Sequence, residues 1–335
     1  MRAFQFIPYL QKMGWNIKVS PLFSDDYIKD LYNKNPLLLH IIKGYFNRLF
    51  YLLYVKHYDL IWIEKEVFPY LPAFVERILN KWGIPYVVDY DDATFHQYDC
   101  HQSWVIRKIL SKKIDTVMNG AKSVITGNRY LAKRAQIANA IDVKIIPTVI
   151  DLDKYSKVAT NRRKQITIGW VGTPVTSRYL DELFPVLDSL KSQFNIKIIA
   201  IGYQKDFINN SITDVLPWSE ESEVKSIQKF DIGIMPLPNK PFERGKCGYK
   251  LIQYMACCLP VVASPVGVNN EIVEHGQNGY LAKTTDEWKT TLSTLILDYK
   301  LRTKMGLNGY EKVSKSFSLR SQAQRFESVL RKAVE

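Results

Sequence analysis

The segment Phe242-Glu-Arg-Gly-Lys-Cys-Gly-Tyr-Lys-Leu-Ile-Gln-Tyr-Met-Ala256 places two glycines and two lysines at the start of a mostly apolar run. It predicts a glycine-spaced basic loop that opens an amphipathic helix. Gly245 and Gly248 let backbone amides approach a ligand closely, and a helix N-terminus adds about half a positive charge. Lys246 and Lys250 are one helical turn apart and can converge on one anion. The segment therefore predicts a diphosphate site; the alternative is an ordinary solvated helix start that carries two lysines.

Outward from this segment, short apolar runs alternate with helical patterns in both halves of the chain. Strands are expected at 16–20, 59–63, 85–89, 123–126 and 143–146, and again at 166–171, 196–201, 232–235 and 260–263. Strands separated by helices predict parallel, doubly wound sheets, so the fold class is α/β with two Rossmann-like domains. A polar, basic linker is expected near 160–164. Two such domains predict a cleft between them, where ligands commonly bind.

Length and composition agree with this organisation. A chain of 335 residues suits two domains of about 150 residues each. The net charge is +13, from 46 basic and 33 acidic residues. Residues 1–155 carry 21 of the basic and 15 of the acidic residues, so the positive charge is spread evenly over the two halves of the chain. An even excess argues against a nucleic-acid-binding tail and fits anionic nucleotides or an anionic membrane surface. The four cysteines show no paired metal spacing, and no signal peptide or membrane-spanning run is recognisable.

The order of motifs resembles that of the retaining glycosyltransferases of family 4, which have the GT-B fold. Met255-Ala256 is followed by Leu259-Pro-Val-Val-Ala-Ser264, then by Gly267, then by Glu271-Ile-Val-Glu-His-Gly-Gln-Asn-Gly279. Upstream, Ile145–Asp151 looks like the strand that leads into the family's interdomain linker, and Ile168–Gly172 like the first strand and turn of its C-terminal domain. The resemblance implies an acceptor-side domain over 1–155, a nucleotide-sugar-binding domain over 156–318, and a C-terminal helix over 319–335 that crosses back.

Carried over position by position, the resemblance implies a donor site with two departures. The first acidic position of the family, which contacts the donor sugar, falls on Gly245, so a sugar contact there would come from main-chain amides or from Glu243. The second, which contacts the ribose, falls on Gln253. The family's phosphate-binding Arg and Lys fall on Thr173 and Arg178. The donor-binding residues implied are Gly172, Thr173, Arg178, Arg244, Gly245, Lys246, Gly248, Tyr249, Lys250, Gln253 and Glu271.

The acidic segment Asp89–Asp99 follows an expected strand, so its acids should face the cleft. The family often has a His-Asp pair at the positions of Asp91 and Asp92. The resemblance therefore implies that Asp91 replaces this histidine and that His96 enters the site from the same loop. Asp89 and Asp92 could alternatively cap the next helix. The spacing matches no standard metal loop, and no metal is expected.

Basic and aromatic residues are interspersed along 37–58 and 104–113. Such helices suit peripheral binding to anionic lipid, whereas the alternative makes them core helices with solvated lysines. The resemblance adds a lipid-linked or saccharide acceptor, a place on the cytoplasmic face of the inner membrane, and a role in surface polysaccharides such as O-antigen.

The resemblance implies a metal-independent, retaining enzyme without a cofactor that transfers a sugar from a UDP-sugar or GDP-sugar to an acceptor hydroxyl. Asp91, His96, Arg178, Lys246 and Lys250 are its candidate catalytic residues. Attack from the front face is expected, with the donor phosphate taking the acceptor proton, so no side-chain nucleophile is needed. The alternative function is a catalytically silent nucleotide-binding or membrane-scaffold protein. No nucleic-acid partner is expected.

The beginning of the sequence departs from the family pattern. A helix is expected over 4–13, whereas the family has a strand and a glycine-rich turn before the equivalent helix. One interpretation is that the reading frame continues upstream by roughly 15–25 residues that code for that strand and turn. The alternative is a genuine short form with a rearranged sheet.

Overall fold

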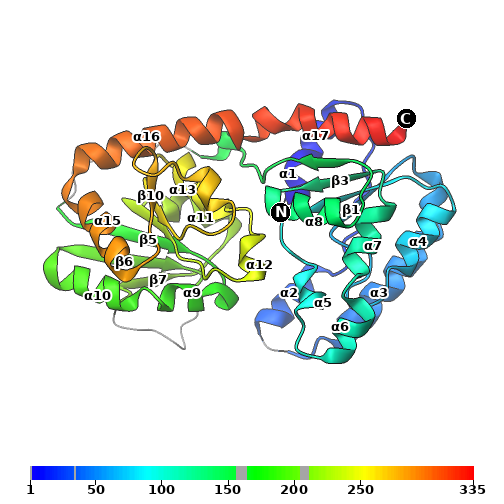
Figure 1. Ribbon diagram of the computed structural model, residues 1–335, viewed down its shortest axis with the longest axis horizontal. Coiled ribbons are helices and arrows are strands. Elements are labelled where there is room, and N and C mark those ends of the chain that lie inside the picture. Colours follow the sequence, from blue (N-terminus) through cyan, green and yellow to red (C-terminus); the bar gives the residue numbers. More distant parts are fainter. Residues whose placement is uncertain (1, 34, 156–163, 204–210) are drawn as a thin grey trace.

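The computed structural model describes residues 2–33, 35–155, 164–203 and 211–335, which form two α/β domains (Figure 1). Each domain contains one parallel sheet covered by helices, so the predicted pair of Rossmann-like domains is confirmed. Most of the linker expected near 160–164 lies outside the described residues.

The N-terminal sheet has the order β1-β2-β3-β4 and is parallel throughout. Its strands are β1 (Ile61–Glu64), β2 (Tyr86–Tyr90), β3 (Ser123–Thr126) and β4 (Val143–Ile145). The helices are α1 (Arg2–Lys12), α2 (Asp25–Tyr32), α3 (Leu38–Leu52), α4 (Phe74–Lys81), α5 (His96–Asp99), α6 (Trp104–Leu110), α7 (Lys113–Gly120) and α8 (Arg129–Ile137), with 3-10 turns η1 (Val55–His57) and η2 (Leu152–Lys154). Val87 and Val88 are both fully buried but belong to different core clusters, because successive strand residues face opposite sides of the sheet.

The C-terminal sheet has the order β10-β9-β8-β5-β6-β7. Its strands are β5 (Ile166–Val171), β6 (Ile196–Ile201), β7 (Asp214–Leu216), β8 (Ile232–Met235), β9 (Val261–Ala263) and β10 (Gly279–Leu281). The helices are α9 (Arg178–Asp181), α10 (Phe184–Gln193), α11 (Glu220–Ile227), α12 (Pro241–Arg244), α13 (Tyr249–Ala256), α14 (Asn269–Ile272), α15 (Thr285–Leu297) and α16 (Tyr299–Ser316), with the 3-10 turn η3 (Pro174–Thr176). β5 and β6 are largely apolar along their whole length, as expected for strands of a sheet that helices cover on both faces.

The last helix, α17 (Leu319–Val334), connects the domains physically (Figure 1). At the junction with α16, the backbone of Ile150 pairs with Phe317 and Leu319 through hydrogen bonds of 2.9 and 2.8 Å. Beyond that junction α17 packs on the N-terminal domain, where Phe326 stacks on Phe6 of α1 with 4.2 Å between ring centroids. The chain therefore leaves the C-terminal domain through α16 and ends against α1.

Two local expectations are wrong. Residues 16–20 form no strand, because β1 pairs only with β2 among the described residues and nothing supplies a ladder for this segment. Asp89 does not cap a helix, because it lies inside β2, and α5 has no side-chain cap from Asp92 either. Alternation and short-range capping were reasonable local signals, but tertiary pairing overrode both.

Across the described residues, no helix has both the length and the apolar character that crossing a membrane requires.

Arg2 and Asp89 form a buried ion pair that holds the start of α1 on the sheet. The Arg2 Nε lies 3.0 and 2.9 Å from the two Asp89 carboxylate oxygens, and its Nη2 donates to the Ile146 carbonyl at 2.6 Å. We expect Arg2→Met to lower the free energy of unfolding by about 3–5 kcal/mol, because it leaves a carboxylate buried without its partner. Denaturant unfolding followed by circular dichroism measures this loss.

The control is Lys29→Met, which breaks the exposed ion pair with Asp26 and should change stability by less than about 1 kcal/mol. Equal losses in the two variants would show that the buried pair does not hold α1 in place.

Candidate functional site

The two domains meet where the carboxyl ends of β2 and β3 face residues 244–248, which we call the basic loop. Asn128, just after β3, donates from Nδ2 to the Gly245 carbonyl at 2.9 Å. The Cys247 thiol donates to the Asp91 carbonyl at 2.9 Å. Gly245 packs so closely that a Cβ there would lie 2.4 Å from the Cβ of Ala93. The basic loop thus joins the C-terminal domain directly to the N-terminal sheet.

Local backbone geometry explains the shape of this loop. Gly245 ends α12, and Gly248 starts α13 with a φ of +66°, a conformation that favours glycine. A Cβ on Gly248 would also lie 2.4 Å from the Ile272 side chain of α14. The predicted glycine-spaced loop that opens an amphipathic helix is therefore confirmed, with a short helix α12 before it.

Each of the first three carboxylates in the acidic segment has its own cation. Arg2 pairs with Asp89 at 2.9 Å and Lys65 pairs with Asp91 at 3.2 Å. Lys246 of the basic loop lies 3.8 Å from Asp92, which is a longer and weaker contact across the domain junction. Burial alone would raise the pKa of Asp91, but the attraction of Lys65 and Arg2 holds it below its usual value. These acids are therefore neutralised by the protein itself.

Lys250 differs from these cations, because no carboxylate of the described residues lies within ion-pair distance of it. Its ammonium group sits over the ring of Trp170 at 4.5 Å from the centroid. Burial and the nearby Lys246 lower its pKa from 10.5 to about 7. The two lysines are thus close enough to interact, as the sequence predicts, and they form a site that favours an anion.

A second contact near the basic loop links α9 to α12 through Tyr179 and Glu243, with Arg178 beside them. The Tyr179 hydroxyl donates to Glu243 Oε1 at 2.5 Å, and the exposed Arg178 guanidinium lies 5.3 Å from the Tyr179 ring centroid. Glu243 is buried, so its carboxylate is engaged within the protein rather than presented for a sugar contact. Gly172 and Thr173 follow β5 at the same edge of the sheet, and Arg244 is exposed at the end of α12.

Gln253 and Tyr249 point into the protein. Gln253 is 1% exposed, and its Nε2 donates to the Tyr155 hydroxyl at 3.1 Å. Its side chain also hydrogen-bonds Glu223, and Tyr249 is half-buried beside Tyr155 and Gln5. A ribose contact by Gln253 remains a prediction, and it would require this side chain to leave its present partners. Glu271 is exposed and lies 3.6 Å from Arg129 of the other domain.

His96 has a partner at each ring nitrogen. Nδ1 lies 2.7 Å from Asp99 Oδ1, and Nε2 lies 2.8 Å from the Tyr130 hydroxyl. It is therefore held within the N-terminal domain and is not presented as a free acid or base. Asp91, by contrast, does lie at the junction, beside Lys65.

The same histidine belongs to a group that could in principle hold a metal. Ligand atoms of His96, Asp99 and Cys100 lie within 4.8 Å of one another. However, Asp99 already pairs with Arg134 at 3.0 Å, and burial raises the pKa of Cys100, which disfavours the thiolate. These residues are a poor fit to a metal, and metal independence remains a prediction.

Sequence reasoning missed several residues of the junction. Asn128 both caps α8, by accepting from the Leu131 amide at 3.0 Å, and binds the basic loop. Its position could have been predicted as a helix cap, because the pair Gly127-Asn128 directly follows an expected strand. Cys247 also lies at the junction, and burial raises the pKa of its thiol to about 12. It is a hydrogen-bonding thiol at the interface, not a nucleophile.

Comparison with known proteins identifies the architecture. Residues 165–298 match the family model described as glycosyl transferases group 1, which spans most of the C-terminal domain. Over 249 residues the chain is 23% identical to an uncharacterised glycosyltransferase of Methanocaldococcus jannaschii, covering 68% of this chain. The chain spans 61% of the length of that relative.

Two solved structures share the arrangement of domains. Sucrose-phosphate synthase from Thermosynechococcus elongatus superposes with a TM-score of 0.65 at 15% identity, covering 91% of this chain and 79% of that one. HepE of Anabaena, solved in complex with UDP and glucose, gives a TM-score of 0.66 at 17% identity, covering 85% and 80%. The chain therefore has the GT-B fold, as its sequence predicts.

Gln253→Glu tests whether this position reads the ribose. A glutamate that contacted the ribose would bind its hydroxyls more tightly than glutamine does, but Gln253 is buried beside Glu223, which favours the opposite outcome. A second carboxylate there must either stay protonated or repel Glu223, so we expect unfolding stability to fall by about 1–3 kcal/mol without tighter binding. Thermal unfolding and calorimetry with UDP measure the two effects.

Gln277→Glu is the control, because Gln277 is exposed in the turn before β10. Tighter UDP binding by Gln253→Glu with stability unchanged would restore the ribose role.

Proposed function

We propose that this protein is a glycosyltransferase that moves a sugar from a nucleoside diphosphate sugar to an acceptor hydroxyl. The observation that carries the proposal is Lys250, for which the described residues supply no carboxylate partner and which lies in the first turn of α13, directly after a glycine-bounded loop between two domains. The group 1 match of the surrounding domain and a GT-B relative solved with UDP support a UDP-sugar or GDP-sugar as the donor.

In this proposal the C-terminal domain binds the diphosphate. Lys246 approaches it from the basic loop, Lys250 from the first turn of α13 and Arg178 from α9, while the amides at the start of α13 add further donors. Negative charge on the leaving diphosphate grows in the transition state, so fixed cations lower the barrier more than they tighten ground-state binding. These cations can perform the role that a metal performs elsewhere, and we propose a metal-independent reaction.

We further propose that the reaction retains the anomeric configuration by attack from the front face. The bond from the acceptor oxygen to the anomeric carbon forms as the bond from that carbon to the diphosphate oxygen breaks. The electron pair leaves with the diphosphate, and the acceptor proton passes to a phosphate oxygen. In this proposal Asp91 orients the acceptor rather than attacking the sugar, and the pairing of its carboxylate with Lys65 supports that role.

The junction also links donor binding to the N-terminal domain. Lys246 is shared between Asp92, at 3.8 Å, and the place proposed for the diphosphate. A diphosphate carries more charge than one carboxylate, so it would attract Lys246 away from Asp92 and loosen this contact between the domains.

The second candidate is a nucleotide-binding scaffold without catalytic activity. It is favoured by Gly245, which stands where the family has a sugar-binding acid and packs against Ala93. Slow hydrolysis of a donor sugar without acceptor separates the two functions, because a scaffold would bind nucleotide without hydrolysing its sugar ester.

For the acceptor, we propose a lipid-linked saccharide of surface-polysaccharide synthesis, reached from the cytoplasmic face of the membrane. One face of α3 exposes Leu38, Leu39, Ile42, Phe46, Leu49 and Phe50 at helical spacing. Trp104 and Ile109 of α6 are exposed beside Lys108 and Lys112. Apolar groups mixed with basic ones suit peripheral contact with anionic lipid. Lys113, expected to contribute, does not, because it is buried and pairs with Glu66.

Lys250→Met tests the donor site directly. Incubation with a panel of UDP- and GDP-sugars should reveal turnover in the parent protein, and the variant should lose about 2–4 kcal/mol of transition-state stabilisation.

UDP binding should also depend on pH. Lys250 has a pKa of about 7 in the free protein and an anion would raise it, so binding above pH 7 requires proton uptake and weakens as pH rises. Calorimetry between pH 7.5 and 9 should show this slope in the parent and not in the variant.

Lys315→Met, which alters an exposed pair with Glu311 on α16, is the matched control and should leave turnover and slope unchanged. Unchanged turnover and slope in Lys250→Met would remove the donor site from the basic loop.

Membrane contact is tested with a variant of α3. Leu39 is 81% exposed, and replacing Leu39 and Phe46 by Glu should abolish sedimentation with vesicles of phosphatidylglycerol and phosphatidylcholine. Leu297→Glu on α15, where the leucine is 72% exposed, is the control and should sediment as the parent does. Equal sedimentation of all three forms would contradict a membrane role for α3.

A further inference from the structure

Tyr130 stands beside His96 at the start of α8, close to the domain junction. It is a half-buried residue of the first turn of that helix, two residues after Asn128, which binds the basic loop. Its hydroxyl oxygen lies 2.8 Å from His96 Nε2. Burial raises the pKa of Tyr130, and the Arg244 guanidinium of the C-terminal domain opposes that rise, so Arg244 is within electrostatic reach of the phenol. The Tyr130 hydroxyl therefore lies on the side of its domain that faces the other domain.

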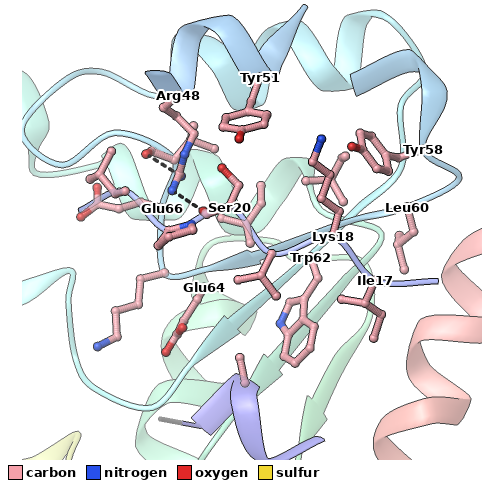
Figure 2. Close-up of a pocket in the computed structure, with 18 of the residues that line it drawn as sticks. Ile17, Lys18, Ser20, Arg48, Tyr51, Tyr58, Leu60, Trp62, Glu64 and Glu66 are labelled. Atoms are coloured by element: carbon pink, nitrogen blue, oxygen red, sulfur yellow. Dashed lines mark hydrogen bonds between the residues drawn. The ribbon is translucent and has the colours of Figure 1, made fainter. Parts of the chain in front are cut away.

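The cavity beside β1 lies on a different side of the same segment. This cavity has a volume of about 670 Å³, and Figure 2 shows Glu64 among the residues that line it. Thr94 and Gln97 line the cavity as well, whereas His96 and Tyr130 do not. Residues 94–97 thus meet the cavity through Thr94 and Gln97 and meet Tyr130 through His96.

Asp99 fixes which ring nitrogen of His96 carries the proton. Its Oδ1 lies 2.7 Å from His96 Nδ1, and its Oδ2 accepts from Arg134 Nη1 at 3.0 Å. A carboxylate that is paired with a guanidinium has no proton to give, so Nδ1 carries the proton of the neutral imidazole and donates it to Asp99. The Cys100 thiol lies 3.5 Å from Nδ1 and is a weak hydrogen-bonding group beside that carboxylate. His96 Nε2 is thus left with its lone pair.

The lone pair on Nε2 decides the direction of the Tyr130 hydroxyl. Because Nε2 can only accept, Tyr130 donates its single proton to His96. The Tyr130 oxygen then offers lone pairs, and no proton, to any further partner. Phe95 packs beside the phenol with 6.3 Å between ring centroids and 27° between ring planes, which restricts its rotation. Tyr130 therefore presents an oriented hydrogen-bond acceptor to the junction.

We propose that Tyr130 is an acceptor-binding residue, whose oxygen accepts a hydrogen bond from a non-reacting hydroxyl group of the acceptor saccharide. His96 and Asp99 are positioning residues that fix the direction of this bond. The inference rests on the proposed glycosyl transfer, in which the attacking hydroxyl gives its proton to the donor phosphate. That proposal assigns the donor to the C-terminal domain. Tyr130 belongs to the other domain, as Asp91 does, so the hydroxyl that meets Tyr130 belongs to the acceptor.

The direction of this hydrogen bond determines what the site selects. A hydroxyl group supplies the proton that the Tyr130 oxygen lacks, whereas a phosphate or carboxylate oxygen would oppose it with lone pairs alone. An alcohol without a second hydroxyl would leave the Tyr130 oxygen without that bond and should be captured about three- to tenfold less well. Tyr130 therefore favours polyols and saccharides over simple alcohols.

The test compares glycerol with 1-propanol, which lacks a second hydroxyl. Both alcohols are added at equal molar concentration to the UDP- or GDP-sugar that the parent hydrolyses fastest, and the two adducts are counted by mass spectrometry. We expect Tyr130→Phe to lower the ratio of glycerol adduct to propanol adduct about three- to tenfold. Because the two alcohols compete in one reaction, a general loss of stability or of donor binding cancels from this ratio.

Two variants of His96 test the relay. His96→Gln keeps an oxygen that can accept from Tyr130 and a nitrogen that can donate to Asp99, so it should retain most of the parent ratio, whereas His96→Leu should lower it. Tyr280→Phe is the matched control. Tyr280 lies beside another histidine, His275, at 5.2 Å between ring centroids, but it packs on the core of the C-terminal domain, and its variant should keep the parent ratio.

The ¹⁵N resonances of His96 provide a measurement that does not depend on turnover. They should show Nδ1 with a proton and Nε2 without one, and the Nε2 resonance should move in Tyr130→Phe. A proton on Nε2 in the parent would overturn the inference, as would an adduct ratio that Tyr130→Phe leaves unchanged, or release of sugar to water with no adduct at molar glycerol. If the parent releases sugar from no donor at all, the proposed glycosyl transfer fails and this inference fails with it.

Discussion

The structure depends on how it neutralises the carboxylates of Asp89, Asp91 and Asp92, which lie together at the domain junction. Each is paired with a cation from a different part of the chain: the first turn of α1, the residue after β1, and the basic loop of the C-terminal domain. Unpaired, three neighbouring acids would repel one another and disfavour this conformation. Their pairing therefore holds α1 on the N-terminal sheet and adds a weaker contact between that sheet and the basic loop.

This allocation of cations distinguishes Lys250 from the other basic residues of the junction. Arg2 and Lys65 are engaged by nearby carboxylates, whereas Lys250 lies over Trp170 and feels the repulsion of Lys246. An incoming anion stabilises the protonated form of such a lysine strongly, because its attraction offsets the cost of burial and the repulsion of Lys246. The proposed diphosphate site thus depends on carboxylates that occupy the neighbouring cations and leave Lys250 to the donor. In the same proposal, the donor influences the contact between the domains through Lys246, which lies 3.8 Å from Asp92.

The sequence predicted most of the fold because the central strands are continuous apolar runs. Strands 123–126, 166–171 and 196–201 were predicted with the bounds that they have, as only a strand buried on both faces tolerates such runs. The basic loop was predicted from its glycines. Tertiary contacts decided the rest: residues 16–20 alternate correctly but find no partner, and Gln253 turns away from the junction to meet Tyr155. Neither outcome has a local signal.

Arg2 connects the first helix to the domain junction. It lies in the first turn of α1, and its guanidinium reaches Asp89. Asp91 follows two residues after Asp89, and the same guanidinium helps to lower its pKa. α1 also contacts the C-terminal helix, where Phe6 stacks on Phe326. One helix therefore touches both the segment that ends the chain and, through a single side chain, the acidic side of the candidate site.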